Sequence, residues 1–257
     1  MNIIINGCCG QMGKILTRLA LEKNNTIYGI TPDAVNLKKD FPVFDDIYKF
    51  NGQADVVIDF STASAVPKLI DYCLYKKIPA VICTTGLSKE TENKILDAAK
   101  IIPIMKSANM SFGINILNLI LEKISKVFFD NDFDIEIIEK HHNKKTDAPS
   151  GTALSLADTI KNSLDQDIDY VFDRNNKNNK ENRKREKNEI GISCVRGGTI
   201  VGEHSIIFAG QDESIEIKHI AQSREIFALG ALKAAEFILN KKPGLYCIKD
   251  MFNDLIK

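Results

Sequence analysis

The stretch EKHHNKKTDAPSGTA, residues 139–153, gathers side chains that could transfer a proton and bind an anion. A histidine can donate a proton near neutral pH, and lysines attract carboxylates. Ser150 is a good N-cap candidate, which leaves the N–H groups of Gly151 and Thr152 free at the positive end of a helix. This combination favours recognition of a small dicarboxylate with acid catalysis beside it. An exposed basic turn before a capped helix is the alternative.

The two histidines reach this stretch from a strand, DIEIIEK, that begins at residue 134. Neighbouring strand residues point to opposite faces, so His141 and His142 cannot easily face one site. We therefore expect them to have two different roles, with Lys145 following them closely.

A second motif, GCCGQMG at residues 7–13, follows a predicted strand and opens a predicted helix. A pyrophosphate needs backbone N–H groups at a helix N-terminus, where side chains would block its approach. Cys8 fills the first slot of the usual GxGxxG frame, and Gly7 stands one residue earlier. The motif predicts a dinucleotide site, and a tight turn without a ligand is the alternative.

Asp33 lies 20 residues beyond Gly13, where a dinucleotide fold often holds the acid that bonds the ribose hydroxyls. A turn aspartate after Pro32 is the other interpretation. Lys38 and Lys39 are near enough in sequence to leave NADPH open beside NADH.

Polar or small residues follow three further predicted strands, in DFST (59–62), CTTG (83–86) and KSANMSFG (106–113). A ligand of a parallel sheet lies outside the carboxyl ends of its strands. Helix capping, by Ser61 or Thr62 and by Ser88, is compatible with such contacts.

Short apolar runs alternate with stretches of helical period over the first part of the chain. The runs at residues 2–6, 26–31, 54–60, 79–86 and 102–109 are typical of buried parallel strands, and helices are predicted over 11–24, 62–77 and 88–100. The alternation predicts a Rossmann-type α/β domain, a doubly wound parallel sheet with helices on both faces.

The pattern changes after residue 110. A helix over 111–128 precedes strands at 133–142, 190–198, 201–210 and 213–223, which indicate an α+β domain with a mixed or antiparallel sheet. We expect a dinucleotide-binding domain over 1–109, with a C-terminal helix within 222–257 returning to it. Residues 110–221 would form the substrate-binding and oligomerisation domain.

Composition excludes several classes of protein. Lys and Arg total 34, as do Asp and Glu, so no global charge favours nucleic acid or an anionic membrane. Residues 173–189 are polar throughout and predict a solvated or partly disordered loop, in which glutamates interrupt the basic charge. No run of eighteen apolar residues and no export signal is present, so we expect neither a transmembrane helix nor secretion.

The six cysteines form no CxxC pair, which fits a reducing cytoplasm. The four histidines offer only the adjacent pair together with His204 and His219, far along the chain. We expect no structural metal.

Taken together, these segments resemble the family of 4-hydroxy-tetrahydrodipicolinate reductase, the dihydrodipicolinate reductase of bacterial lysine and diaminopimelate synthesis. The stretch 139–153 is similar to the family signature, which reads E, any residue, HH, two residues, K, any residue, DAPSGTA. GCCGQMG, DFST, TTG, SANMSFG, RGGTIVGEH and FAGQDESIEIKHIAQSR also resemble family segments in the family's order. The resemblance covers nearly the whole chain.

It implies hydride transfer from NADH or NADPH to a cyclic, unsaturated dicarboxylate, in a homotetramer assembled through the sheet of the second domain. His141 would be the proton donor and Lys145 its catalytic partner, while His142, Gly151 and Thr152 would bind substrate carboxylates. Nucleotide contacts would come from Gly7, Cys8, Cys9, Gly10, Gln11, Met12, Asp33, Cys83, Thr84, Thr85, Ser107, Ala108, Asn109 and Met110. The two domains would close over the substrate.

The sequence departs from the family at residues 174–189, which lack the glycines usual there. Two other classes stay open from the residues themselves. A dehydrogenase of an amino-acid semialdehyde would share the glycine loop but not the HHNKKTDAPSGTA block, and a nucleotide-binding module could dispense with His141 and Lys145.

Overall fold

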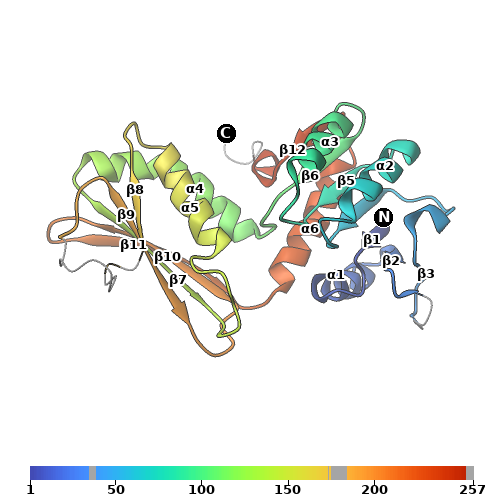
Figure 1. The fold of residues 1–257 in the computed structure, drawn as a ribbon, viewed down its shortest axis with the longest axis horizontal. Coiled ribbons are helices and arrows are strands. Elements are labelled where there is room, and N and C mark those ends of the chain that lie inside the picture. Colours follow the sequence, from blue (N-terminus) through green and yellow to red (C-terminus); the bar gives the residue numbers. More distant parts are fainter. Residues whose placement is uncertain (35–38, 173, 175–183, 253–257) are drawn as a thin grey trace. The chain divides into compact units, whose positions relative to one another are not determined.

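The computed structural model describes residues 1–34, 39–172, 174 and 184–252 (Figure 1). The chain forms two compact units. Unit 1 comprises Met1–Phe112 and Arg224–Lys257, and unit 2 comprises Gly113–Ser223.

Unit 1 is built on a seven-stranded sheet in which every pair of neighbouring strands is parallel. Its order is β12-β6-β5-β4-β1-β2-β3. The strands are β1 (Asn2–Asn6), β2 (Thr26–Ile30), β3 (Val43–Phe44), β4 (Val56–Asp59), β5 (Ala80–Ile82), β6 (Pro103–Lys106) and β12 (Gly244–Tyr246). The doubly wound α/β prediction is confirmed.

Helices pack on this sheet because its central strands are apolar on both faces. The helices are α1 (Gln11–Glu22), α2 (Val66–Lys76), α3 (Lys89–Ala99) and α6 (Glu225–Ile238). Helix α1 packs with α6, and α2 packs with α3. The α2–α3 pair shares a buried core with Ile4, Val57 and Ile82, all completely buried.

The C-terminal segment contains the helix predicted within 222–257 and two further elements. Helix α6 ends at Ile238, and after Pro243 the chain forms β12, which pairs in parallel with β6, and a short 3-10 helix, Ile248–Met251. Sequence patterns missed β12 and β3 because two or three residues at a sheet edge carry no readable period.

Unit 2 is built on a five-stranded mixed sheet in the order β11-β10-β7-β9-β8. Its elements are α4 (Phe112–Asp130), β7 (Asp134–His141), α5 (Gly151–Asn162), β8 (Asp169–Phe172), β9 (Glu189–Arg196), β10 (Gly202–Ala209) and β11 (Ser214–Ala221). Strand β7 runs antiparallel to β10 and parallel to β9. The mixed sheet is as predicted, and α4 and α5 cover its apolar face over a core that includes Ile137, Ile192 and Ile206 (Figure 1).

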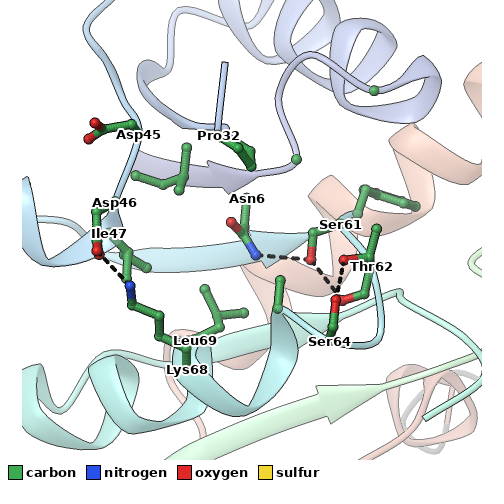
Figure 2. A pocket seen from close by; sticks show the side chains of 15 residues that line it. Asn6, Pro32, Asp45, Asp46, Ile47, Ser61, Thr62, Ser64, Lys68 and Leu69 are labelled. Atoms are coloured by element: carbon green, nitrogen blue, oxygen red, sulfur yellow. Dashed lines mark hydrogen bonds and ion pairs between the residues drawn. The ribbon is translucent and has the colours of Figure 1, made fainter. Parts of the chain in front are cut away.

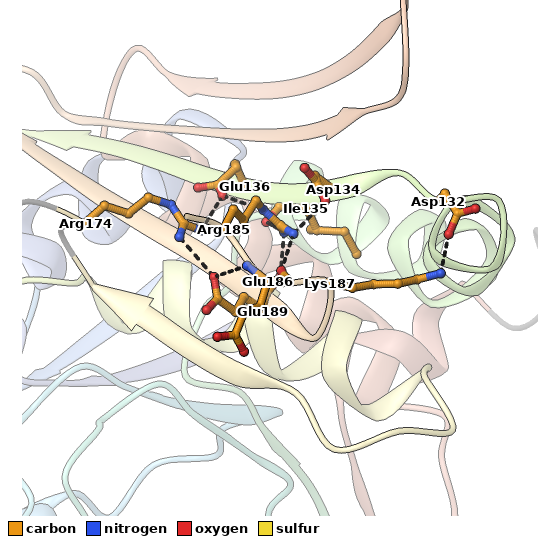
Figure 3. A network of polar contacts seen from close by, with 9 residues as sticks. All are labelled: Asp132, Asp134, Ile135, Glu136, Arg174, Arg185, Glu186, Lys187 and Glu189. Carbon is orange, nitrogen blue, oxygen red and sulfur yellow. Dashed lines mark hydrogen bonds and ion pairs between the residues drawn. The ribbon is translucent and has the colours of Figure 1, made fainter. Parts of the chain in front are cut away.

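The predicted solvated loop over 173–189 is wrong at its end, and most of it lies outside the described residues. Glu189 opens β9 and is only 2% exposed. Arg185 donates to Asp134 at 2.6 Å and to Glu136 at 3.1 Å, and Arg174 pairs with Glu136 and Glu189 (Figure 3). The carboxylates of a neighbouring strand attract these arginines, and a linear composition count cannot register such partners.

Within the described residues, no helix combines the length and apolar character needed to cross a membrane.

Candidate active site

The glycine loop between β1 and α1 is packed so closely that two of its glycines are obligatory. Gly7 has φ +81°, and a Cβ there would lie 2.5 Å from the Phe60 carbonyl oxygen. A Cβ on Gly13 would lie only 2.0 Å from the Gly7 carbonyl oxygen. The start of α1 is therefore held against the loop, which is the geometry that brings a helix N-terminus to a phosphate.

Some of the loop's N–H groups are already used within the fold. The N–H groups of Gly7 and Cys8 donate to the Ile30 carbonyl, and that of Gly10 donates to the Gly7 carbonyl. Gly10 is the N-cap of α1 and provides no side-chain cap. The donors available to an anion are thus those of the first turn, beginning at Gln11 and Met12.

The two loop cysteines have different surroundings. Cys8 is buried, and its Sγ lies 2.7 Å from where a Cβ on Gly29 would be. Burial raises the pKa of Cys8 to about 12, so this thiol stays protonated. Cys9, whose sulfur lies 3.9 Å from that of Cys8, is half-buried.

A cavity of about 470 Å³ opens beside this loop (Figure 2). Gly7, Gly10 and Pro32 line it, together with Ser61, Thr62 and Ser64 after β4. Asp33 is exposed in the turn that follows Pro32.

Asp45 and Asp46, which were not predicted from the sequence, line the same cavity directly after β3. Asp46 pairs with Lys68 at 2.5 Å. The signal was weak because β3 has only two residues.

Asp59 ties together the ends of three strands. It is completely buried, and its carboxylate accepts from Asn6 Nδ2 at 2.8 Å, Ser61 Oγ at 2.5 Å and Thr84 Oγ1 at 2.6 Å. Burial raises its pKa although these donors oppose the shift. Ser61 thus belongs to the hydrogen-bond network around Asp59. The N-cap of α2 is Ala65, so the predicted cap at Ser61 or Thr62 is wrong.

A second cavity, of about 450 Å³, lies at the ends of β5 and β6. Thr84, Thr85, Ser107 and Ala108 line it. Cys83, like Thr84, is buried, and the Ser107 Oγ donates to the Asn109 carbonyl at 2.8 Å.

Met110 is buried, and its carbonyl oxygen lies 1.8 Å from where a Cβ on Gly230 of α6 would be. Its backbone is therefore packed against α6. The cavities, the glycine loop and the start of α1 fit the two halves of a dinucleotide at the carboxyl edge of the sheet.

In unit 2, the end of β7 carries a buried acid–histidine pair. Residues 134–141 alternate in burial, so Glu139 and His141 share the core face of the sheet. The His141 Nδ1 lies 2.6 Å from the Glu139 Oε2. Arg196 of β9 binds both oxygens of the same carboxylate, at 2.7 and 2.6 Å.

These contacts set the charges of the pair. Burial raises the pKa of Glu139, but the hydrogen bonds of Arg196 and His141 outweigh it and hold the pKa at about 2. Burial lowers the pKa of His141, and Glu139 opposes that shift while Lys145 and Arg196 reinforce it. Glu139 is therefore an anion beside a histidine that titrates below its usual range.

Ser150 connects this pair to a second histidine. Its N–H donates to Glu139 Oε1 at 3.0 Å, and its Oγ lies 3.1 Å from His204 Nε2. The Oγ also accepts from the Ala153 N–H, which confirms Ser150 as the N-cap of α5. The His141 and His204 rings are 5.2 Å apart, and burial, followed by repulsion from His141, lowers the pKa of His204 to about 4.

The start of α5 is not free as predicted. Lys145 pairs with Asp147 at 2.7 Å, and the Gly151 backbone also helps to lower the pKa of the Asp147 carboxyl. Hydrogen bonding from Lys145 lowers the pKa of Asp147. Asp147, itself one residue of the quoted stretch, therefore occupies the Lys145 ammonium, one of the donors expected to bind a substrate carboxylate. Thr152 also has a partner.

Unit 2 thus brings together His141, Lys145, Gly151 and the half-buried His142 around the loop between β7 and α5. Glu139, Arg196 and His204 were not predicted as site residues from the sequence. The Glu-x-His spacing on a strand was a usable signal for the first, because residues two apart share a face. The other two come from neighbouring strands through sheet register.

Comparison with known proteins places the chain. The family model described as "Dihydrodipicolinate reductase, C-terminus" matches residues 113–252, and its N-terminal counterpart matches residues 1–110. The chain belongs to the dihydrodipicolinate reductase family. The 4-hydroxy-tetrahydrodipicolinate reductase of Clostridium tetani is 50% identical over 255 residues, which cover 98% of this chain and 97% of that protein.

Solved structures share the fold at much lower identity. Dipicolinate-bound dihydrodipicolinate reductase from Paenisporosarcina sp. TG-14 is 22% identical and gives a TM-score of 0.80, covering 96% of this chain and 97% of that one. The WlbA dehydrogenase from Chromobacterium violaceum, in complex with NADH and UDP-GlcNAcA, gives 0.58 at 10% identity, covering 95% and 87%. These two structures thus share the fold of this chain.

Proposed function

We propose that this chain reduces 4-hydroxy-tetrahydrodipicolinate to tetrahydrodipicolinate with a nicotinamide cofactor, in the diaminopimelate route of lysine biosynthesis. The observation that carries the proposal is the buried Glu139–His141 pair beside Lys145, in a member of the dihydrodipicolinate reductase family. When bound, the nicotinamide supplies a hydride. The substrate gains this hydride and one proton, and its hydroxyl leaves as water.

His141 is the proposed proton donor. Its pKa is low without a ligand because burial and two nearby cations disfavour the imidazolium. A substrate with two carboxylates beside the ring raises the pKa of His141 again, so substrate binding also favours protonation of His141. This coupling makes the acid available only when there is something to protonate.

Lys145, His142 and the α5 start, with Gly151 and Thr152, are the proposed carboxylate binders. A cation and backbone N–H groups at a helix N-terminus hold a carboxylate with charge-assisted hydrogen bonds. The Asp147 carboxylate already pairs with Lys145 at 2.7 Å, and the Gly151 backbone also lowers the pKa of that carboxyl, which supports a carboxylate site at this place. The substrate must displace Asp147 from Lys145.

We assign the nucleotide to unit 1 and the substrate to unit 2. The α1 start, from Gln11 and Met12, would hold the pyrophosphate, with Gly7, Cys8, Cys9 and Gly10 shaping the loop. Asp33 would reach the ribose of the adenosine half. Cys83, Thr84, Thr85, Ser107, Ala108, Asn109 and Met110 would border the nicotinamide half. Both NADH and NADPH stay open as donors.

A coupled assay tests the activity. Aspartate semialdehyde, pyruvate and dihydrodipicolinate synthase generate the substrate, and absorbance at the nicotinamide band follows NADH or NADPH. Oxidation that requires the synthase supports the proposal, and oxidation by the semialdehyde alone favours a semialdehyde dehydrogenase. Running both cofactors side by side gives the preference.

The roles of His141 and Lys145 are tested by substitution. His141→Gln and Lys145→Ala should lower kcat by about 10²–10⁴-fold, the usual loss for a general acid, while NADH affinity is nearly unchanged. Lys144→Ala is the matched control because Lys144 is a neighbouring but exposed lysine. Normal turnover of His141→Gln would remove the assignment.

We also propose a homotetramer that associates through the sheet of unit 2, and a cytoplasmic location. Val195 and Ile220 are 44% and 52% exposed on the strand positions that alternate with the core. Light scattering should give a mass four times the 28.7 kDa of one chain. Cell fractionation tests the location.

A further inference from the structure

Glu139 is a completely buried carboxylate to which the proposed function assigns no role. It stands two residues before His141 on the core face of β7. Burying an anion is costly unless hydrogen bonds and an opposite charge compensate it. Glu139 therefore keeps a charged side chain in the core of unit 2, where an apolar side chain would carry no such cost.

Arg196, His141, the Cys194 thiol and the Ser150 N–H all hydrogen-bond to this carboxylate. Oε1 accepts from Arg196 Nη2 at 2.6 Å and from the Ser150 N–H at 3.0 Å. Oε2 accepts from Arg196 Nη1 at 2.7 Å and lies 2.6 Å from His141 Nδ1. Arg196 also donates to the Asp147 carbonyl at 2.7 Å, so the loop that carries Lys145 is tied to the same cation.

The hydrogen bonds to Glu139 determine which nitrogen of the His141 ring carries the proton. An ionised carboxylate only accepts hydrogen bonds, so the proton between Glu139 and His141 belongs to Nδ1. The atom of His141 that titrates is then Nε2. A Cβ on Gly202 would lie 3.1 Å from Nε2, so a glycine at this position leaves that edge of the ring uncrowded.

We propose that Glu139 is a positioning residue for proton transfer: it holds the Nδ1–H of His141 through the reaction cycle, so that Nε2 alone gives up and regains the proton, and Arg196 keeps Glu139 anionic. The proposal rests on His141 being the proton donor of the proposed function. The ring keeps one orientation in both protonation states, because the Nδ1–H contact persists when Nε2 loses its proton.

Charged and titratable groups face His141 from several elements. Glu139 on β7, Lys145 on the following loop and Arg196 on β9 act on it directly, and the His204 ring of β10 lies 5.2 Å away. Behind them, Cys194 on β9 bonds Glu139, Asp147 pairs with Lys145, and His219 on β11 acts on His204. Burial, Lys145 and Arg196 disfavour the imidazolium of His141 and so lower its pKa, whereas Glu139 favours the imidazolium. Removing the Glu139 charge should therefore make His141 a stronger acid that is protonated only at lower pH.

The tautomer can be read without any turnover. In ¹⁵N-histidine-labelled protein, long-range ¹H–¹⁵N spectra distinguish a protonated from an unprotonated ring nitrogen, and the His141→Gln spectrum assigns the signal. We expect neutral His141 to carry its proton on Nδ1 while Nε2 titrates. Neutral His141 protonated on Nε2 would overturn the proposal, whatever substrate the enzyme uses.

Kinetics test the consequence. In Glu139→Gln alone, the amide NH₂ would face two hydrogen-bond donors in either orientation, and the Arg196 cation would lose its carboxylate. We therefore combine this substitution with Arg196→Gln. Glu139→Asp, which keeps the charge, is the conservative variant. The effect of Glu139 on the pKa of His141 is larger than the opposite effect of Arg196. In the double variant the fall of kcat at high pH should therefore move to lower pH, with about tenfold lower kcat at high pH for each unit of this shift, while the KM for NADH stays within about twofold.

A purely structural role predicts something else. The double variant would then lose rate equally at all pH values, and Glu139→Asp would not restore the wild-type pH profile; either result contradicts the proposal. If His141→Gln itself retained normal turnover, the proton-donor assignment would fail, yet the tautomer measurement would still decide the contact between Glu139 and His141.

Discussion

The glycine loop between β1 and α1 leaves no room for a side chain at Gly13. Gly13→Ala would drive its Cβ to 2.0 Å from the Gly7 carbonyl, and backbone cannot move aside as a flexible side chain can. We expect a loss of about 1–3 kcal/mol of stability, or about 2–10 °C in Tm, together with weaker NADH binding. Calorimetry and NADH fluorescence measure the two effects.

Gly10→Ala is the control for stability. Its Cβ would lie 3.3 Å from the same Gly7 carbonyl, and Gly10 is exposed. This variant should keep its Tm within about 2 °C. Equal losses in the two variants would mean that the close approach at Gly13 is not what constrains the loop.

Individual residues were predictable where their chemistry is local in sequence. Ser88 and Ser150 cap the helices that follow them, because a cap needs only a side-chain oxygen within three residues of an N–H group. Arg196 was not predictable, since it meets Glu139 through the pairing of β7 with β9, 57 residues away. The register of these two strands depends on how they pack in the folded sheet, and no short sequence pattern predicts it.

The helix α5 and the loop before it supply the proposed carboxylate site, and the same loop supplies Asp147, whose carboxylate competes with the substrate for Lys145. The Asp147 side chain is 54% exposed, so its ion pair with Lys145 is worth no more than about 1 kcal/mol. A substrate with two carboxylates can displace it at that modest cost. The loop would then exchange one carboxylate for another without leaving Lys145 unpaired.

Asp147→Asn tests this exchange. The amide keeps the shape of the side chain but no longer competes for the Lys145 ammonium, so the Kd of dipicolinate should fall about two- to fivefold. Isothermal titration calorimetry at two salt concentrations measures it, and Lys145→Ala, which should weaken binding, is the opposite control. Weaker dipicolinate binding by Asp147→Asn would mean that Asp147 orients Lys145 and does not compete with the ligand.

Among the elements, the long buried strands and amphipathic helices were predicted within a few residues, as for α1 (11–24 against Gln11–Glu22) and α3 (88–100 against Lys89–Ala99). The errors lie at the edges. Strand β8 has four residues, of which Asp169 and Phe172 are exposed, so it shows neither an apolar run nor clean alternation. Short edge strands form because a neighbour offers hydrogen bonds, which the sequence of the strand itself does not record.

Two buried ionisable groups, His204 and Glu139, should make unit 2 lose stability over two successive pH ranges as the solution becomes acidic. Burial keeps His204 neutral in the folded chain down to about pH 4, whereas an unfolded histidine is protonated below about pH 6.5. Glu139 is anionic in the folded chain down to about pH 2, whereas an unfolded glutamate is protonated below about pH 4.5. In both windows the unfolded chain binds more protons, so stability falls as pH falls.

His204→Asn isolates the first window. A shift from 6.5 to about 4 corresponds to stability on the order of 3 kcal/mol lost between pH 6.5 and 4, and no more from this group below pH 4, where the folded chain is protonated as well. Asparagine can still bond the Ser150 Oγ but cannot bind the proton. Urea unfolding followed by far-UV circular dichroism suits a chain without tryptophan, and it should show a shallower loss over this interval in the variant. If wild type and variant lose stability in parallel from pH 6.5 to 4, the acid sensitivity of this window comes from other groups and the burial of neutral His204 does not govern it.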